Sequence, residues 1–516
     1  MDLINGVYIK DFEWESFDFP LKLTSVSMKL GYYNFPSDSL ITITRDELFN
    51  IKATIEFASR DKNACEYREI SNSLDKGQFI EGESLIAFNN IHKYELKDCT
   101  IRSYSVAPAD STFLTIYFVA DLIINSITEI NENEAEVDSV ADWFLTSKSG
   151  IRYQRQTDRF SSGNILKVRK TVDKEVEITN DNIRHLRGGA WDFFIVKLDE
   201  FSFIVQETPK EILPSWANGI SIEYRMDLGE IPSKETRVAI SEILSFVLGV
   251  EFIKVGTSKF NIGKKVIRRY ANKPLGDNII DRCKNGRLPP IHFDEFYART
   301  NVEDKIKDII PAYLKLRKHL GLDTAIWKYW IGRNAMIGTN LPIMSSSIEG
   351  MADKYLKYYS KISNPSDEEK RKYEDYCKAN NDFIDGLQVF SFTKSLIDKI
   401  NNPYDITGGE KMRIFFKSLG LNFHKKSIET KALKSRNLMA HSSIDTSMNE
   451  AEILMLLKKT VRLTRAYETL FNRVMLKILG YNGKYIDYYT FGHPALELSE
   501  NIKANDKMEG PESSEQ

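Results

Sequence analysis

The sequence of 516 residues has few of the side chains that build metal sites or disulfide frameworks. It contains four cysteines and seven histidines, and the cysteines are widely separated. No CxxC pair occurs, and no cysteine has a histidine at ligand spacing. A zinc site and a disulfide framework are therefore not expected, and the free thiols fit a reducing compartment. We expect neither a metal nor a cofactor.

The common enzyme signatures are also missing. None of the patterns GxGxxG, GxxxxGK[ST], HExxH and GxSxG occurs, which argues against dinucleotide, P-loop, zinc-protease and serine-hydrolase chemistry. The 71 basic residues are balanced by 73 acidic ones, giving a formal charge of −2. This balance excludes a uniformly basic nucleic-acid coat but leaves room for a local basic patch.

Long apolar runs are absent as well. The longest, 112–124, is too short to cross a bilayer and is interrupted by Asp121. The first residues lack the basic and apolar regions of a signal peptide. We therefore expect a cytoplasmic protein that has no membrane partner.

The region 1–290 is predicted to be rich in β-strands. Alternating apolar and polar residues, as in 39–44, are typical of half-buried strands. Two such runs flank Asp199 and predict a hairpin. One helix is expected to begin at Ser233 and to end at Gly249. These features predict a sandwich-like domain with one packed helix.

The hydrophobic period changes to a helical one further along the chain. Asn-Gly and Pro-Pro pairs in 273–292 indicate an interdomain connection. A helical bundle is predicted over 300–490, so the fold class is α+β. The polar segment 499–516 is expected to be a disordered tail.

The last predicted helix is long. Ser447 and Glu450 match a capping box at its start, and Gly480 marks its end. Its apolar stripe is broad enough to be buried on more than one side. A core helix is the simplest interpretation, and a homodimer interface is a second one.

An arginine and a histidine separated by four residues occur twice, at Arg287–His292 and at Arg436–His441. About one match is expected by chance in a chain of this size when four to six intervening residues are permitted. Two prolines keep the first match out of a helix interior. The second ends a cationic helix, and a polar residue, Asn437, follows its arginine.

The second match has the groups that metal-free RNA cleavage requires. An imidazole exchanges protons near neutral pH, and a guanidinium binds a phosphodiester and the charge that develops on it. Asn437 and His441 share one helix face, whereas Arg436 points about 140° from His441 on an ideal helix. The structural alternative is that Arg436 and His441 only stabilise the helix dipole.

The segment RNLMAH resembles the R-x4-6-H motif of HEPN domains, which are helical bundles that include metal-independent ribonucleases. The long helix that follows, together with 473–488, resembles the HEPN domain of ApeA-type anti-phage proteins, and the β-rich region looks like their N-terminal domain. The resemblance implies a defence effector that cleaves host RNA, with tRNA a candidate substrate and a phage protein a candidate trigger. It also implies a homodimer or higher homo-oligomer, in which motifs from two protomers form a composite site.

The resemblance assigns catalytic roles to Arg436 and His441 and an assisting role to Asn437. A glutamate on an earlier helix often accompanies this motif, and Glu349 is the best match. Its alternative interpretation is a solvated carboxylate at a helix start. Four lysines are expected to guide the RNA backbone, although a solvated cationic face would look the same. They are Lys425, Lys426, Lys431 and Lys434.

Two alternatives stay open from the sequence. One is a non-catalytic HEPN module that binds RNA or a protein through a regulatory β-domain. The other is a regulatory or antitoxin-like scaffold, in which Arg436 and His441 would be buried in the bundle.

Overall fold

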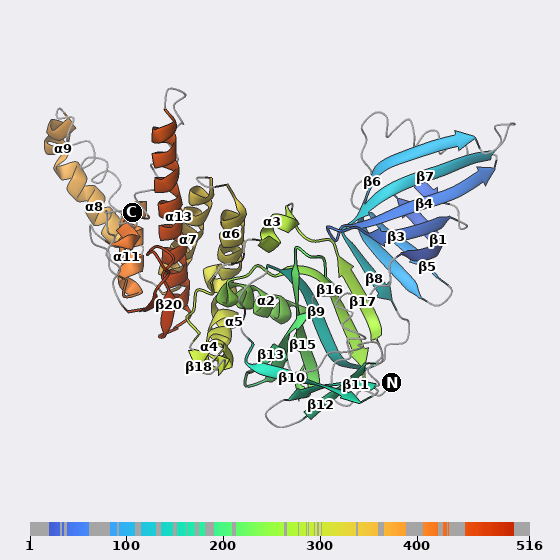
Figure 1. Ribbon diagram of the computed structural model, residues 1–516. Helices are drawn as coiled ribbons and strands as arrows, with labels where there is room; N and C mark the ends of the chain where they lie inside the picture. The colour runs from blue at the N-terminus through green and yellow to red at the C-terminus, as the bar shows by residue number, and fades with distance from the viewer. Residues whose placement is uncertain are drawn as a thin grey trace. The chain divides into compact units, whose positions relative to one another are not determined.

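The structure is a computed structural model with two compact units (Figure 1). The residues that it describes are 20–30, 33–35, 39–60, 83–89, 92–108, 115–130, 136–147, 151, 153–162, 164–170, 175–180, 190–208, 213–262, 266–276, 278–284, 286, 288–293, 295–296, 299–300, 302–336, 339–359, 366–388, 406–421, 427–430, 432 and 449–499. The predicted tail beyond 499 lies outside them.

We call the first unit the β unit and the second the helical unit. The β unit comprises Met1–Pro289 and Phe293–Asp308, and the helical unit comprises Pro290–His292 and Ile309–Gln516. Strands dominate the first and helices the second, so the fold is mixed α+β. The short helix α4 (Val302–Lys307) belongs to the β unit, although the sequence suggested a helical region from residue 300.

Six strands of the β unit close into a barrel. Neighbours pair antiparallel in the order β1, β3, β4, β7, β6, β5, and β5 pairs again with β1. The strands are β1 (Leu21–Leu30), β3 (Leu40–Arg45), β4 (Ile51–Arg60), β5 (Glu83–Phe88), β6 (Lys93–Pro108) and β7 (Thr115–Ile124).

The barrel interior is apolar because its strands alternate. In β3 and β4, Ile41 lies opposite Ile55 and Ile43 opposite Ala53, and all four are buried. The sequence predicted a sandwich-like domain, and the closed ring differs from that expectation. Alternation shows that one face of a strand is buried, but it does not show whether the first and last strands of a sheet pair with each other.

A second run of antiparallel strands continues from the barrel through β8 (Ser126–Ile130), which pairs with β6 and β17. Strands β13 and β14 form the hairpin predicted around Asp199. The run consists of β17 (Val266–Asn272), β16 (Ile253–Asn261), β9 (Val137–Thr146), β15 (Asn218–Gly229), β14 (Phe201–Thr208), β13 (Ala190–Lys197), β10 (Arg155–Ser162), β11 (Asn164–Lys170) and β12 (Glu175–Asn180).

Smaller elements complete the β unit. Glu303 of α4 is bound by Arg155 of β10 (Nη2–Oε2 2.7 Å) and by the backbone N–H of Ile195 in β13 (2.9 Å). These bonds hold α4 against the sheet. The remaining elements are β2 (Tyr33–Phe35), which pairs with the end of β1, α3 (Ile279–Lys284), β18 (Glu295–Phe296) and β19 (Arg299–Thr300).

Helix α2 (Lys234–Leu248) has the ends that the sequence predicted. The Ser233 side chain accepts a hydrogen bond from the Thr236 N–H, and Gly249 ends the helix with a φ of 70°. A left-handed φ suits glycine, and a Cβ on Gly249 would lie 2.7 Å from the Leu288 carbonyl oxygen. The apolar side chains along one face of α2 are buried: Ile240, Ile243, Leu244, Val247 and Leu248.

A buried carboxylate, Asp142 of β9, fixes α2 to the sheet. Its Oδ2 accepts from Arg237 of α2 at 2.9 Å, and its Oδ1 accepts from Lys254 at 2.7 Å and Thr257 at 2.6 Å. Burial alone would raise the pKa of Asp142. The charges of Lys254 and Arg237, with the hydrogen bonds, hold that pKa below its usual range.

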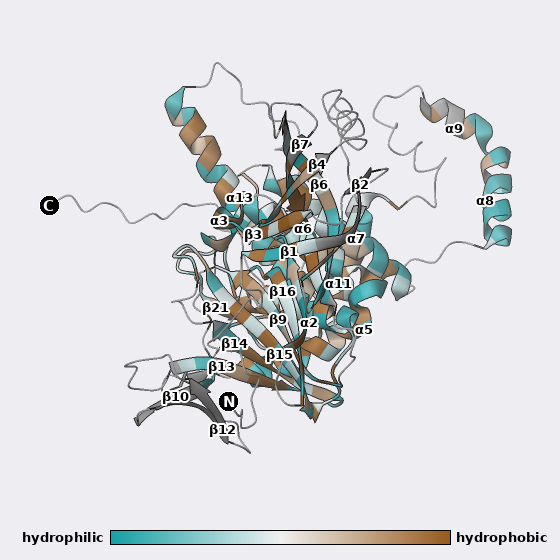
Figure 2. Cartoon of the chain, turned by 90° about the vertical axis from the view of Figure 1, so that its right-hand side faces the viewer, coloured by the Kyte–Doolittle hydropathy of each residue, from teal (hydrophilic) through white to brown (hydrophobic). Residues whose placement is uncertain are grey.

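The helical unit is built around α7 (Asn340–Tyr358) and α13 (Glu450–Ile478), which pack together. The first helical stretch of the chain after residue 300 is divided at Asp308, because Pro311 cannot donate to the carbonyl of Lys307. Other elements are α5 (Ile309–Leu320), α6 (Leu322–Asn334), α8 (Asp367–Ala379), α9 (Asn381–Gln388), α11 (Gly408–Ser418), β20 (Lys484–Ile486) and β21 (Ala495–Glu497). Figure 2 shows that α8 is hydrophilic along its length.

The start of α13 differs from its prediction. Asn449, not Ser447, is the N-cap, and the capping box is completed by Glu452. Ser447 lies outside the described residues. The helix ends at Ile478, and Gly480 follows with a φ of 72°, close to the predicted end.

Replacing Asp142 with asparagine should destabilise the β unit at neutral pH by about 3–5 kcal/mol, since Arg237 would keep its charge and lose its buried counter-ion. Urea unfolding of wild type and D142N measures the difference. The matched control is D199N in the exposed β13–β14 turn, which should change stability by less than about 0.5 kcal/mol.

The stability difference between wild type and D142N should depend on pH. Asp142 has a lowered pKa in the folded state, so its stabilisation is complete above the unfolded pKa of about 3.9. It is lost as the pH falls through the folded pKa. The difference between wild type and D142N should therefore shrink below about pH 4. A difference that stayed constant down to acid unfolding would contradict the charge-based explanation.

Candidate functional site

The motif residues of the proposed nuclease site lie in parts of the chain that the structure does not describe. Their predicted roles therefore stay predictions. This applies to Arg436, Asn437 and His441 and to Lys425, Lys426, Lys431 and Lys434. The described residues nearest to them are 427–430 and 432 on one side and the start of α13 on the other.

Glu349 is the one predicted site residue that is described. It lies in α7, nine residues after Asn340, so it is about 14 Å along the helix. The alternative of a carboxylate at a helix start is therefore wrong. Glu349 is half-buried, and its Oε1 accepts a hydrogen bond from Ser345 at 2.9 Å. Glu349 thus has a fixed orientation on a helix that packs against α13.

The chain just before the motif is packed inside the helical unit. The Ser427 hydroxyl accepts from the Thr430 N–H at 3.3 Å, as an N-cap residue does. Ile428 and Ala432 are completely buried, and so is the side chain of Glu429. Residues 427–432, as far as they are described, are therefore held in place by buried contacts.

A buried ion pair fastens this segment to α13. Arg473 of α13 donates through Nη1 to Oε1 of Glu429, and both side chains are only 1% exposed. The Arg473 guanidinium also lies 5.8 Å from the ring centre of Tyr485. Because each charge needs the other once both are removed from water, the pair fixes the position of Glu429 along α13.

A second buried pair involves Glu468 of α13, five residues before Arg473. Nε of Arg333, on α6, is 3.8 Å from Oε1 of Glu468, and the guanidinium lies over the rings of Tyr329 (5.6 Å) and Trp330 (5.1 Å). Burial lowers the pKa of Arg333, but the charges of Tyr329, Glu468 and Tyr488 outweigh it and raise the pKa. Arg333 is therefore held as a cation.

Polar residues also attach the chain after α13. Asp487 accepts from Thr469 of α13 at 3.2 Å, from the Tyr489 N–H at 2.8 Å and from Thr490 at 2.5 Å. Asn472 lies between Glu468 and Arg473 on α13 and is completely buried, and its amide has no hydrogen-bond partner among the described residues. Asp487 thus attaches the chain after α13 to the C-terminal half of that helix.

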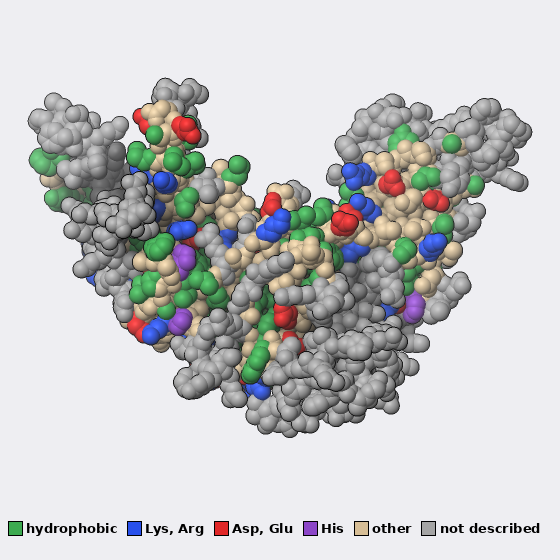
Figure 3. Space-filling view, viewed as in Figure 1, with side chains coloured by type: hydrophobic (Ala, Val, Ile, Leu, Met, Phe, Trp, Pro, Cys, Tyr) green, Lys and Arg blue, Asp and Glu red, His purple; other side chains and the backbone are tan. Residues whose placement is uncertain are grey.

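The N-terminal half of α13 has a different environment. Its apolar side chains are exposed: Ile453 37%, Leu454 51%, Met455 68% and Leu457 47%. Figure 3 shows hydrophobic side chains gathered on this end of the helix. We call these four residues the α13 patch.

Comparison with known protein families, with curated proteins and with solved structures finds no match for this chain. None of the described helices combines the length and the apolar character needed to span a membrane. In the described ranges, no three His, Cys, Asp or Glu side chains gather where they could hold a metal ion.

Sequence reasoning missed the two buried arginine pairs. Glu429 and Arg473 are 44 positions apart, and Arg333 and Glu468 are further still. The one available signal was charge on helices that are otherwise apolar. Arg473 lies among apolar residues in the second half of α13, which is an unusual place for a cation unless it is paired.

Replacing Arg473 with methionine should destabilise the helical unit by about 3–5 kcal/mol, because the buried Glu429 carboxylate would lose the Arg473 cation. The double variant E429M/R473M should recover most of that loss, since two apolar side chains would fill the same space. Chemical denaturation of the two single variants and the double variant gives the coupling free energy.

K477M, near the end of the same helix, is the matched control, because Lys477 is a partly exposed cation. It should change stability by less than about 0.5 kcal/mol. A double variant as unstable as R473M would show that the pair does not act as a unit.

Proposed function

We propose that the protein is a metal-independent endoribonuclease of the HEPN type that acts in anti-phage defence. Its substrate class is host RNA, with tRNA as the first candidate. In this proposal the helical unit is a HEPN bundle, and residues Arg436 and His441 form the catalytic site with help from Asn437 and Glu349.

The proposal rests on the sequence motif Arg436–His441 and on the described residues before and after it. The segment before it is fixed by the Glu429–Arg473 pair, and the chain after it enters α13. Glu349 lies on α7, which is joined to α13 by the buried hydrogen bond from Thr464 to Asn340 at 3.2 Å. These anchored neighbours support a site that needs positional accuracy.

The proposed chemistry needs only the motif side chains and the RNA itself. His441 removes the proton from a ribose 2′-OH, and the 2′-oxygen attacks the adjacent phosphorus. The bond to the 5′-oxygen breaks, and that oxygen takes a proton. Arg436 stabilises the additional negative charge on the phosphoryl oxygens, and Asn437 orients the imidazole. The products are a 2′,3′-cyclic phosphate and a 5′-hydroxyl.

The reaction moves two protons, one away from the 2′-OH and one to the 5′-oxygen. A site with two imidazoles has both a general base and a general acid. A homodimer would supply a second His441 as the general acid. The α13 patch supports such an assembly, because four exposed apolar side chains on one helix favour association with a second copy. In the same proposal the β unit senses infection or restrains the nuclease.

His441→Ala should abolish RNA cleavage and toxicity while the thermal midpoint stays unchanged, because the change removes only the proton-transferring group. The measurement is digestion of total RNA with EDTA present, followed by sequencing of the RNA ends. Cleavage by wild type under chelation is expected.

His292→Ala is the control, because His292 belongs to the chance match and its backbone N–H, which bonds Lys484, is retained. It should cleave like wild type. Undiminished cleavage by H441A would remove His441 from the mechanism. RNA binding without any cleavage by wild type would favour the alternative of a non-catalytic HEPN module.

The double variant L454D/M455D should convert a wild-type dimer to a monomer and should lower cleavage in parallel, since two charges would be placed on the α13 patch. Light scattering at micromolar concentration measures the mass. The control is L275D, a similarly exposed leucine of the β unit (86%), which should leave the mass unchanged. A monomeric wild type would contradict the composite site.

A further inference from the structure

A series of aromatic rings in contact crosses the C-terminal end of α7. The ring centre of Tyr358 lies 5.1 Å from that of His319 on α5 and 4.9 Å from that of Tyr359. The series continues from Tyr359 to Tyr355 at 4.5 Å and from Tyr355 to Phe415 of α11 at 5.3 Å. The rings therefore join α5, α7 and α11 within the helical unit.

Three rings at one end of this series are exposed. Tyr358 is 42% exposed and Tyr359 is 41% exposed, and His319 is exposed as well. We call these three residues the ring surface. The other end of the series is fixed, because Phe415 is completely buried and Tyr355 packs on it. Contacts between rings thus hold the exposed side chains in a defined orientation.

Exposed lysines flank the ring surface. Lys315 precedes His319 by one turn of α5, and Lys354 precedes Tyr358 by one turn of α7, so each lysine lies on the same helix face as its ring. The Lys354 side chain extends across the start of α6, where a Cβ on Gly321 would lie 3.0 Å from its Cδ. Cationic and aromatic groups of two helices therefore lie together.

The aspartates at these helix ends already have cationic partners. Asp323, in the first turn of α6, is 2.9 Å from Nζ of Lys318, and Asp353 is 3.1 Å from Nζ of Lys411 on α11. The two lysines that flank the ring surface make no ion pair with the residues that the structure describes. The local charge around the rings is therefore positive.

Exposed rings beside uncompensated cations match a single-stranded nucleic acid. A base of any sequence offers a flat face to an aromatic ring, and a lysine neutralises a phosphate. Burial, with Tyr355 and Tyr358, raises the pKa of Tyr359, so its hydroxyl is neutral and does not repel a phosphate. Because lysine is depleted at protein–protein interfaces, the flanking lysines favour RNA over a protein partner.

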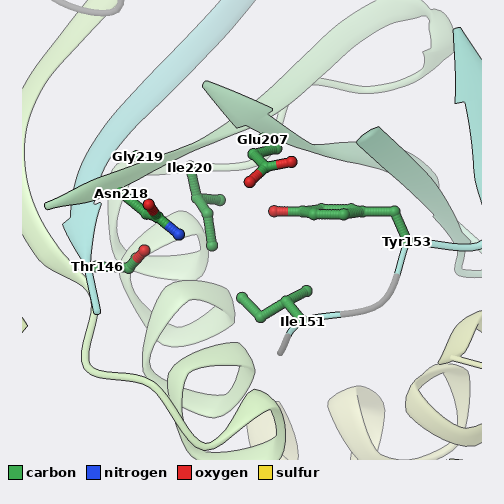
Figure 4. A pocket seen from close by; sticks show the side chains of 7 residues that line it. All are labelled: Thr146, Ile151, Tyr153, Glu207, Asn218, Gly219 and Ile220. Atoms are coloured by element: carbon green, nitrogen blue, oxygen red, sulfur yellow. The ribbon is translucent and has the colours of Figure 1, made fainter. Parts of the chain in front are cut away.

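The pocket at Tyr153 in the β unit is too small to bind a base. Its lining includes Thr146, Glu207 and Asn218 from the ends of three adjacent strands (Figure 4). About 10 Å³ is open to the centre of a water-sized sphere, which is room for one water molecule. An open surface such as the one on α5 and α7 has no such limit.

We propose that the ring surface binds unpaired bases of single-stranded RNA by stacking on Tyr358 and His319, while the flanking lysines contact the phosphates. This inference rests on the proposed function and deepens it, because it assigns a second RNA-binding surface in the helical unit. It predicts a preference for loops and free ends over duplexes, since the base faces of a duplex are already stacked.

The test is binding of a fluorescent single-stranded RNA of about 12 nucleotides. Fluorescence anisotropy is measured with EDTA present on the full chain carrying H441A, so that the RNA stays intact. Tyr358→Ala should weaken binding by about tenfold, because one stacked base is lost. Tyr358→Phe keeps the ring and should bind like the H441A parent. Equal affinities of Y358A and the parent would overturn the proposal.

The matched control is Tyr376→Ala in α8, because Tyr376 is a tyrosine with 67% of its surface exposed. It should bind the RNA like the parent. If Y358A does not fold, His319→Ala takes its place with the same expected loss. A loss of affinity in Y376A as large as that in Y358A would show that the ring surface is not a specific site.

An abasic strand of the same length separates stacking from charge. Y358A should bind it like the parent, because no base is present to stack. Lys354→Gln should weaken the binding of both strands and should lower the salt dependence, the slope of log K against log salt, by roughly 0.7. An equal loss for Y358A on both strands would indicate a structural effect and would overturn the stacking.

RNA binding and RNA cleavage can fail separately. Cleavage by wild type, with no effect of Y358A on affinity, would remove the ring surface and keep the nuclease. Binding that depends on Tyr358, without cleavage by wild type, would remove the nuclease and keep the ring surface. Absence of RNA binding by the parent would overturn the ring surface, and a lower mass of Y358A in light scattering would then assign it to contact between copies.

Discussion

The buried contact between Glu429 and Arg473 is the constraint on which the arrangement of the helical unit depends. Both charges are withdrawn from water, so neither is tolerated without the other. A buried ion pair adds a directional requirement to the packing of the apolar side chains around it. The contact therefore determines where the chain lies on α13 immediately before the segment that carries the proposed catalytic residues.

The β unit also uses a buried ion pair to attach a helix to its sheet, whereas the core of its barrel is apolar. Asp142 joins α2 to the sheet through Arg237 and Lys254, because a helix on a sheet can otherwise shift. The barrel core is built largely of isoleucine, leucine and alanine. Its closed ring of backbone pairing already fixes the register, so it requires no buried charge.

The two halves of helix α13 have similar compositions but different environments. Its C-terminal half is enclosed, and even its polar side chains are buried there, as Thr469, Asn472 and Arg473 show. Its N-terminal half has a similar apolar content, yet Met455 is 68% exposed. The exposed half has the properties of an interface, and the enclosed half has those of a core. The proposed dimer and the anchored motif segment thus depend on the same helix.

The sequence by itself determined the local features of this protein. It predicted the ends of α2, the hairpin at Asp199 and the end of the last helix, because caps and turns depend on residues within about four positions. The tertiary structure decided which distant groups meet: the closed barrel, the Glu429–Arg473 pair and the pocket at Tyr153. These contacts join residues far apart in the chain, and no local pattern encodes which partners the packing of the whole unit will bring together.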